Sequence, residues 1–163
     1  MPKDAEKSSE KKSVQVAVNR KAKFKYEILE SFEVGLALTG GEVKSLRDHK
    51  VSLSDSYAAF RGAELYLLNL DIAPYKHAGY ATHEPKRPRK LLLHRRELRK
   101  LAGKVSQRGF TLIPLGVHFN NRGWAKVRLG LARGRQLYDK RRAIREREQK
   151  RDMARQSRKY SAH

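Results

Sequence analysis

The chain has 163 residues, of which 39% are hydrophobic, and its formal net charge is +21 at pH 7. This length suits one compact domain with tails, and the lack of cysteine excludes disulfides, thiolate zinc sites and cysteine nucleophiles. So basic a chain makes nucleic acid the first partner to consider and an anionic membrane the second.

The first thirteen residues are polar and charged, so we expect residues 1–13 to be disordered and not to form a secretory signal. No later apolar run is long enough to span a bilayer, which favours a cytoplasmic protein with no membrane partner. Val14 to Val18 then alternates apolar and polar residues as a strand does, and the same period of two runs from Phe24 to Leu38.

Gly40-Gly41 interrupts the strand pattern, and Glu42 to Arg47 reads as a short helix. Leu53 to Phe60 and Leu65 to Leu70 predict a hairpin that turns at Arg61-Gly62. Residues 71–90 contain three prolines and look irregular.

Leu91 to Val105 reads as a helix, with an apolar stripe on one face and basic residues on the other. Phe110 to Phe119 and Trp124 to Leu131 predict a second hairpin that turns at residues 120–123. About six strands with short turns and one long helix predict a mainly β fold, an OB-type closed antiparallel barrel with flanking helices over residues 14–132.

The apolar pattern collapses in residues 133–163, which therefore read as a basic C-terminal tail. Charge pairs four residues apart, Arg142 with Glu146 and Glu146 with Lys150, favour helix locally. We expect this tail to be mobile alone and helical when a partner holds it.

The charge is sorted along the chain. Residues 86–108 carry ten Lys or Arg against one Glu, and residues 133–163 carry twelve against four acidic residues, whereas residues 24–85 carry six basic and nine acidic ones. Two basic blocks around a near-neutral body predict a footprint for a polyanion. If about six of these side chains touch single-stranded phosphates, log affinity falls against log salt with a slope of about −4.

Aromatic side chains could stack on bases, each contributing about 1–3 kcal/mol. Tyr57, Tyr66 and Trp124 lie within strand patterns and are expected in the core. Tyr75, Tyr80 and Tyr138 lie outside the apolar alternation and are the better stacking candidates.

Catalytic patterns are absent from the sequence. The six histidines show no metal-ligand spacing, the serines around Asp55 lack a Gly-x-Ser-x-Gly turn, and Gly40-Gly41 lacks a phosphate-loop signature. The sequence therefore predicts no catalytic residue, no metal site and no cofactor.

Several strings together resemble the small protein B family, the SsrA-binding proteins that partner tmRNA. They span nearly the whole folded part in the family's order: Asn19–Ala22, Gly41–Arg47, Ser54–Tyr57, Arg89–Leu93, Gly130–Gly134 and Asp139–Arg141. One departure is Asp48-His49-Lys50, which lacks the family's customary turn glycine.

The resemblance implies a non-enzymatic RNA-binding adaptor of trans-translation. Such a protein binds the tRNA-like domain of tmRNA and helps deliver alanyl-tmRNA to stalled ribosomes. Its C-terminal tail enters the empty mRNA channel as a helix, near the decoding region of 16S rRNA. We expect a monomer in solution.

Carried over by position, the resemblance implies two sets of site residues. The RNA-binding set lies on the body and at the start of the tail: Asn19, Glu33, Arg89, Lys90, Leu92 and Gly134. The ribosome-binding set lies in the tail: Tyr138, Asp139, Lys140 and Arg141. A carboxylate such as Glu33 suits an acceptor for base or ribose donors, a role that Lys and Arg cannot fill.

Two alternatives remain open from the sequence. A general ribosomal OB protein would share the charge and fold but would not prefer tmRNA over ribosomal fragments. An RNA-processing enzyme would show metal-dependent turnover of RNA, but the sequence lacks a coherent set of acid–base or metal-binding residues for it.

Overall fold

A computed structural model describes residues 13–77, 79, 82–107, 109–134 and 137–160. Tyr80 and nearly all of the predicted disordered segment 1–13 lie outside these residues.

The described residues form nine strands and four helices. The strands are β1 (Val14–Val18), β2 (Tyr26–Leu36), β3 (Val51–Ser52), β4 (Tyr57–Arg61), β5 (Glu64–Leu68), β6 (Asp71–Ile72), β7 (Arg89–Leu92), β8 (Phe110–Phe119) and β9 (Ala125–Gly134). The helices are α1 (Ala22–Lys25), α2 (Gly40–Arg47), α3 (Arg95–Val105) and α4 (Leu137–Tyr160).

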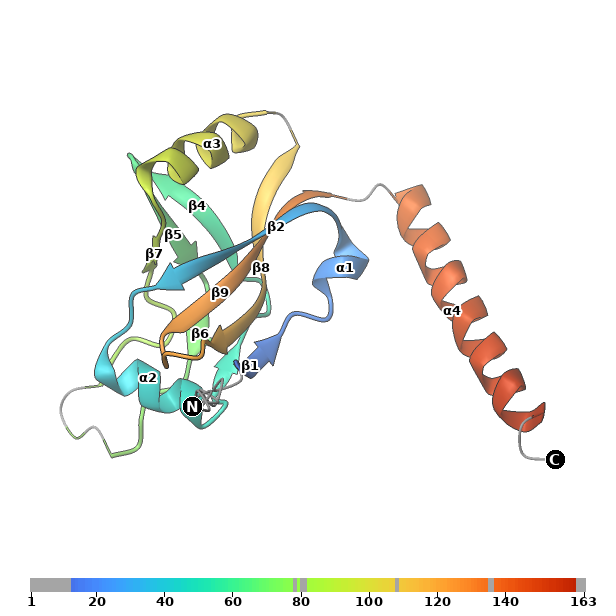
Figure 1. Ribbon diagram of the computed structural model, residues 1–163, viewed down its shortest axis with the longest axis horizontal. Helices are drawn as coiled ribbons and strands as arrows, with labels where there is room; N and C mark the ends of the chain where they lie inside the picture. The colour runs from blue at the N-terminus through green and yellow to red at the C-terminus, as the bar shows by residue number, and fades with distance from the viewer. Residues whose placement is uncertain (1–12, 78, 80–81, 108, 135–136, 161–163) are drawn as a thin grey trace, which may run out of the picture.

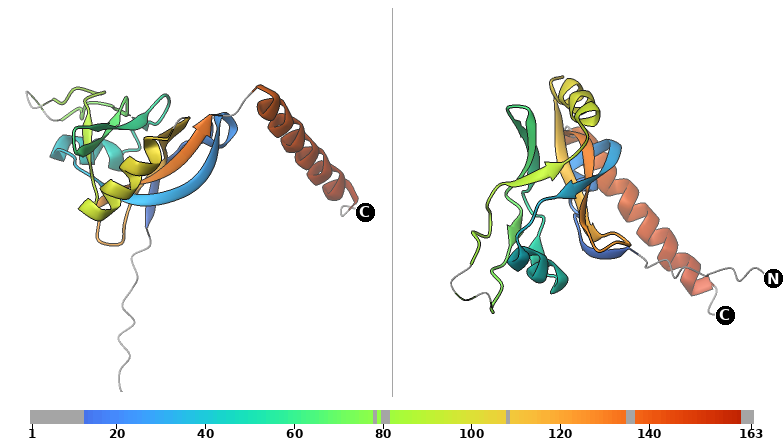
Figure 2. Two further views of the ribbon diagram at one scale, coloured as in Figure 1. Left: turned by 90° about the horizontal axis from the view of Figure 1, so that it is seen from above. Right: turned by 60° about the vertical axis from the view of Figure 1, so that its left-hand side comes forward.

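Six strands close into a ring in the order β8-β4-β5-β7-β2-β9, because β9 pairs with both β2 and β8. β1 adds to the outside of β8, and every pairing is antiparallel. Helices α3 and α2 lie at opposite ends of the ring (Figures 1 and 2). The predicted mainly β fold with about six strands and flanking helices is confirmed.

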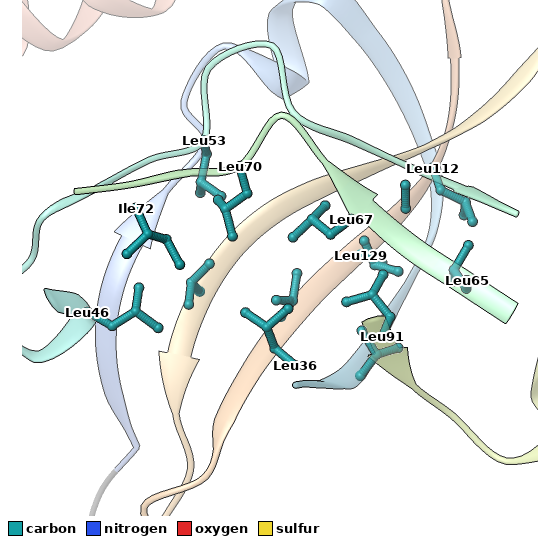
Figure 3. Packing of buried hydrophobic residues seen from close by; sticks show 14 of the residues in the cluster. Leu36, Leu46, Leu53, Leu65, Leu67, Leu70, Ile72, Leu91, Leu112 and Leu129 are labelled. Atoms are coloured by element: carbon teal, nitrogen blue, oxygen red, sulfur yellow. The ribbon is translucent and has the colours of Figure 1, made fainter. Parts of the chain in front are cut away.

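The core fills the inside of this ring with aliphatic side chains. Alternate residues of the strands point inward, since successive side chains of a strand face opposite sides. Figure 3 shows them gathered against the curved sheet, with Leu46 of α2 among them. Leu65, Leu67 and Leu129 are fully buried, and Leu101 of α3 belongs to the same cluster. Both end helices are thus held by apolar contacts with the ring.

The predicted helix over Leu91–Val105 starts four residues too early. Residues 89–92 form β7, which pairs with β5 and β2, and α3 begins at Arg95. The side chain of Glu97 accepts a hydrogen bond from the backbone N–H of His94 at 3.2 Å, as an N-terminal helix residue does. Leu91 and Leu92 therefore do not belong to the apolar stripe of the helix.

His49 occupies the turn where the resemblance led us to expect glycine. Its φ is 57°, in the left-handed region that favours glycine. Its Nδ1 lies 3.1 Å from the carbonyl oxygen of Val16, so the side chain ties this turn to β1. The departure from the family pattern thus adds a contact that a glycine cannot make.

The tail forms one helix, α4, which projects from the body close to α1 (Figure 1). Its described side chains are exposed apart from Ala143, so it buries little apolar surface. Strand β9 runs to Gly134, two residues beyond the expected end of the barrel. That the tail is mobile alone and becomes helical when a partner holds it stays a prediction.

Candidate nucleic-acid interface

Strands β2, β9 and β8 present a polar grid on the outside of the ring. Glu33 pairs with Arg128, and Arg128 pairs in turn with Gly116. The next row joins Gly35, Lys126 and His118. Residues that pair across neighbouring strands share a face, so one acid and several basic groups meet over β9.

A groove of about 1040 Å³ runs between this grid and β1. It is lined by both Asn19 and Glu33, two of the predicted RNA-binding residues that lie fourteen positions apart in the sequence. Its basic lining residues are Arg20, Lys23, Arg128 and Arg147. The groove therefore combines cations for phosphates with amide and carboxylate groups for bases or ribose.

Asn19 is fixed at the junction of β1 and α1. Its backbone N–H donates to the carbonyl of Leu115 at 2.8 Å, and its side-chain Nδ2 donates to the carbonyl of Pro114 at 3.0 Å. Both acceptors lie in β8. This amide is consequently held rigidly against the rim of the groove.

A second hollow of about 590 Å³ adjoins the groove and shares Asn120 and Asn121 with it. It is lined by Leu92 and Trp124, whose exposed fractions are 52% and 67%. Two large apolar groups left in solvent beside a cationic groove suit stacking and van der Waals contact with bases.

The expectation that Trp124 lies in the core is therefore wrong. It precedes β9 and follows the turn at residues 120–123, so it does not share the inward alternation of the strand. Tyr57 is also 41% exposed, and Tyr66, half-buried, donates a hydrogen bond to Glu64 at 2.8 Å. Tyr75 contacts the ring of His77 edge-on, at 5.5 Å between ring centres.

Gly35 allows Leu92 to reach the hollow. A Cβ atom built on Gly35 would lie 3.0 Å from Cβ of Leu92, closer than nearly all Cβ contacts in proteins. Because Gly35 and Leu92 pair across β2 and β7, the absence of a side chain at position 35 lets Leu92 stand over the strand. The glycine thus shapes the apolar end of the interface.

Arg89, which was predicted to contact RNA, is buried in the structure. Arg89 points inward from β7 and its side chain is 0% exposed. Its guanidinium donates to Oε1 of Glu42 and to the carbonyls of Leu70 and Pro85. No donor is left facing solvent, so Arg89 has a structural role.

Glu42 is the centre of this buried network. It accepts hydrogen bonds at 2.7 Å from both Nε and Nη2 of Arg87, and its Oε2 accepts one from the backbone N–H of Thr39 at 2.9 Å. Burial raises the pKa of the Glu42 carboxyl, but the hydrogen bonds and the charges of the two arginines outweigh it and leave that pKa below 4.5. Burial lowers the pKa of Arg89.

Lys90 points to the opposite side of β7, toward solvent, as does Leu92 two residues on. Its ammonium donates to Oε1 of Glu64 at 2.8 Å, and this hydrogen bond raises the pKa of Lys90. Lys90 and Leu92 can be assigned to the exposed face from the sequence only if residues 89–92 are read as a strand, because alternate residues of a strand face opposite sides.

The remaining predicted residues lie at the start of the tail. Gly134 ends β9 opposite Tyr26 and is exposed. The side chains of Tyr138, Asp139 and Lys140 lie outside the described part of the structure, and Arg141 is exposed on α4.

Sequence reasoning missed His118 and the cations Arg20, Lys23 and Arg128 as members of one site. Pairing β2 with β9 and β9 with β8 brings them together, and no local motif encodes that register. The alternation of exposed residues along each predicted strand was the available signal.

Among the described residues, no group of three His, Asp or Glu side chains could hold a metal ion. Within the same residues, no helix has the length and apolar character needed to cross a bilayer.

A closed ring of antiparallel strands with a cationic outer groove defines a class, the small nucleic-acid-binding barrels. A model of the family described as "SmpB protein" matches residues 16–159. The chain belongs to this family.

Relatives and a solved structure agree with that membership. The "SsrA-binding protein" of Acaryochloris marina is 55% identical over 141 residues, which cover 86% of this chain and 91% of that protein. The "SsrA-binding protein" of Thermus thermophilus is 59% identical over 127 residues, covering 78% and 88%. A chain solved under the description "tmRNA-SmpB: a journey to the center of the bacterial ribosome" superposes with a TM-score of 0.64 at 55% identity, covering 79% of this chain and 94% of that one.

Proposed function

We propose that this protein is an RNA-binding adaptor of trans-translation, without catalytic activity of its own. It binds the tRNA-like domain of tmRNA and delivers alanyl-tmRNA to a stalled ribosome in the cytoplasm. One observation carries the proposal: Asn19 and Glu33, which the family pattern marks, line a single groove beside Arg20, Lys23 and Arg128. Relatives named SsrA-binding proteins support the choice of RNA.

Within this proposal each surface has a role. The cations of the groove bind phosphates, Asn19 forms hydrogen bonds with bases or ribose, Glu33 accepts hydrogen bonds from their donors, and Leu92 contacts a base. Lys90 adds positive charge beside Leu92, and Gly134 lies where the body ends and the tail begins. Tyr138, Asp139, Lys140 and Arg141 begin the segment that enters the mRNA channel next to 16S rRNA.

The test is binding to the tRNA-like fragment of tmRNA at physiological salt, with excess ordinary tRNA and ribosomal RNA as competitors. We expect binding to survive both competitors and to weaken in Glu33→Ala. Glu84→Ala is the matched control, because Glu84 is exposed outside both hollows. Binding that vanishes under competition would replace this proposal with a general ribosomal RNA-binding protein.

Leu92→Ala tests the apolar end of the interface. We expect affinity for the fragment to fall with unchanged thermal unfolding, since Leu92 is exposed and its loss opens no core cavity. Leu29→Ala is the matched control, because Leu29 is 44% exposed on β2 and lines neither hollow. Equal losses in both variants would contradict a specific role for Leu92.

A further inference from the structure

The carboxylate of Glu33 is held by a side chain two strands away. Nε2 of His118 in β8 lies 3.1 Å from Oε2 of Glu33 in β2, and β9 runs between the two strands. Both side chains lean over β9 toward each other, above the positions of Arg128 and Lys126. Both also line the same groove.

The contact has a defined direction. An ionised carboxylate only accepts hydrogen bonds, so Nε2 of His118 must carry the hydrogen. The neutral tautomer with its proton on Nε2 fulfils this need, and so does the imidazolium. A charge on the histidine is therefore not required for the contact.

Exposure separates the roles of the two groups. The side chain of His118 is 15% exposed, whereas that of Glu33 is 56% exposed. The imidazole is thus packed into the floor of the groove, and the carboxylate stands above it with room for a second partner. A packed group that fixes an exposed one reduces the side-chain freedom that binding must otherwise remove.

We propose that His118 is a positioning residue that orients the Glu33 carboxylate for hydrogen bonds from amino or hydroxyl donors of the bound RNA. The inference rests on the proposed function, because it deepens the role of Glu33 in the same groove. Phosphates repel a carboxylate, so Glu33 can face RNA only where cations hold the backbone; Arg128 occupies the same row of the grid and Arg20 and Lys23 the same groove.

The alternative is that His118 itself contacts RNA. The two roles differ in whether the effect of His118 depends on Glu33. A positioning residue has no effect once the carboxylate is removed, whereas a direct contact keeps its effect. A double-mutant cycle measures this difference.

The experiment measures affinity of the full chain for a transcript of the tRNA-like fragment, using wild type, Glu33→Ala, His118→Leu, His118→Gln and the double variant Glu33→Ala/His118→Leu. We expect His118→Leu to weaken binding by about fivefold to tenfold. His118→Gln keeps an N–H donor at a similar reach and should stay within about twofold of wild type. In the Glu33→Ala background, His118→Leu should change affinity by less than about twofold.

Thermal unfolding of each variant accompanies the binding data, and His118→Gln serves as the folded reference should leucine perturb the strand. If His118→Leu weakens binding as much in the Glu33→Ala background as it does in the wild type, the inference is overturned in favour of direct contact. Failure of His118→Gln to restore binding would overturn it as well. If the wild type does not prefer the tRNA-like fragment over ordinary tRNA, only the proposed function is overturned. The coupling between positions 33 and 118 can still be measured, because it comes from the affinities of the variants for the fragment.

Discussion

At the scale of single residues, burial decides which charged groups are structural and which face a partner. Arg89 and Lys90 are adjacent basic residues in the same strand. Arg89 is enclosed by Glu42 and backbone carbonyls, whereas Lys90 lies half-exposed beside Glu64. A basic block in the sequence therefore contains residues with opposite roles, and the period of the strand separates them.

The buried network predicts a large effect of Glu42→Gln. The substitution keeps the shape but leaves Arg87 and Arg89 without their carboxylate, and breaking a buried pair from one side costs about 3 kcal/mol or more. We expect a clear fall in the free energy of unfolding, measured with urea. Glu64→Gln is the control at an exposed pair with Lys90 and should change the unfolding midpoint little.

The same carboxyl predicts acid sensitivity. Because the pKa of Glu42 in the folded protein lies below its ordinary value of 4.5, its stabilisation is present above that value and is lost as the pH falls through the lower pKa. The thermal unfolding temperature of the wild type should therefore drop more steeply than that of Glu42→Gln as the pH falls below 4.5. Parallel curves for the two proteins would contradict the shift.

At the scale of elements, the β8–β9 hairpin sets the geometry of both hollows. Asn120 accepts hydrogen bonds from the backbone N–H groups of Arg122 and Trp124, at 3.1 and 2.8 Å. Gly123 has a φ of +82°, which glycine adopts without strain. This turn fixes the register that places Lys126 and Arg128 beside His118 and Gly116.

Two glycine substitutions, with opposite expected effects on the free energy of unfolding, test how backbone conformation sets the role of each glycine. Gly123→Ala should destabilise the protein by about 1 kcal/mol, because alanine resists a positive φ. Gly103→Ala should stabilise it by about 0.5–1 kcal/mol, since Gly103 lies inside α3 and an added Cβ meets nothing within 4 Å. Denaturant unfolding of both variants measures the difference, and a shift of the same sign in both would contradict the backbone argument.

The accuracy of prediction from sequence also follows the elements. Both hairpins were predictable, because alternation and turn residues are local signals. The start of α3 was not, since Leu91 and Leu92 continue the apolar spacing of the helix although their backbone pairs with β2. Trp124 was misplaced for a related reason: the strand pattern includes it, but it precedes the paired residues of β9. Asn19 and Glu33 were found by family resemblance, whereas their shared groove depends on pairing across three strands.

At the scale of the whole molecule, charge and fold are separable. The ring carries its own aliphatic core, and the cations of the groove lie on its outer surface and on α4. Log affinity for RNA should fall with log salt concentration with a slope of about −4 if about six phosphates are contacted. Arg128→Ala should reduce the magnitude of that slope by about 0.7–0.9. Lys104→Ala, whose ammonium already pairs with Glu30 outside the groove, should leave the slope unchanged.

The tail and the body should also separate in function and stability. The described side chains of α4 are nearly all exposed, so truncation after Gly134 removes little packing and should leave the main unfolding transition within about 0.5 kcal/mol of the full chain. Circular dichroism should show the helical signal of α4 melting gradually below that transition, because an isolated helix lacks tertiary support. Under the proposed function, the truncated protein keeps its affinity for the tRNA-like fragment at physiological salt and fails to support tagging on stalled ribosomes. If the truncated protein loses both its affinity for the fragment and its rescue activity, part of the RNA interface lies on the tail. Arg147, which lines the groove, would be the first candidate.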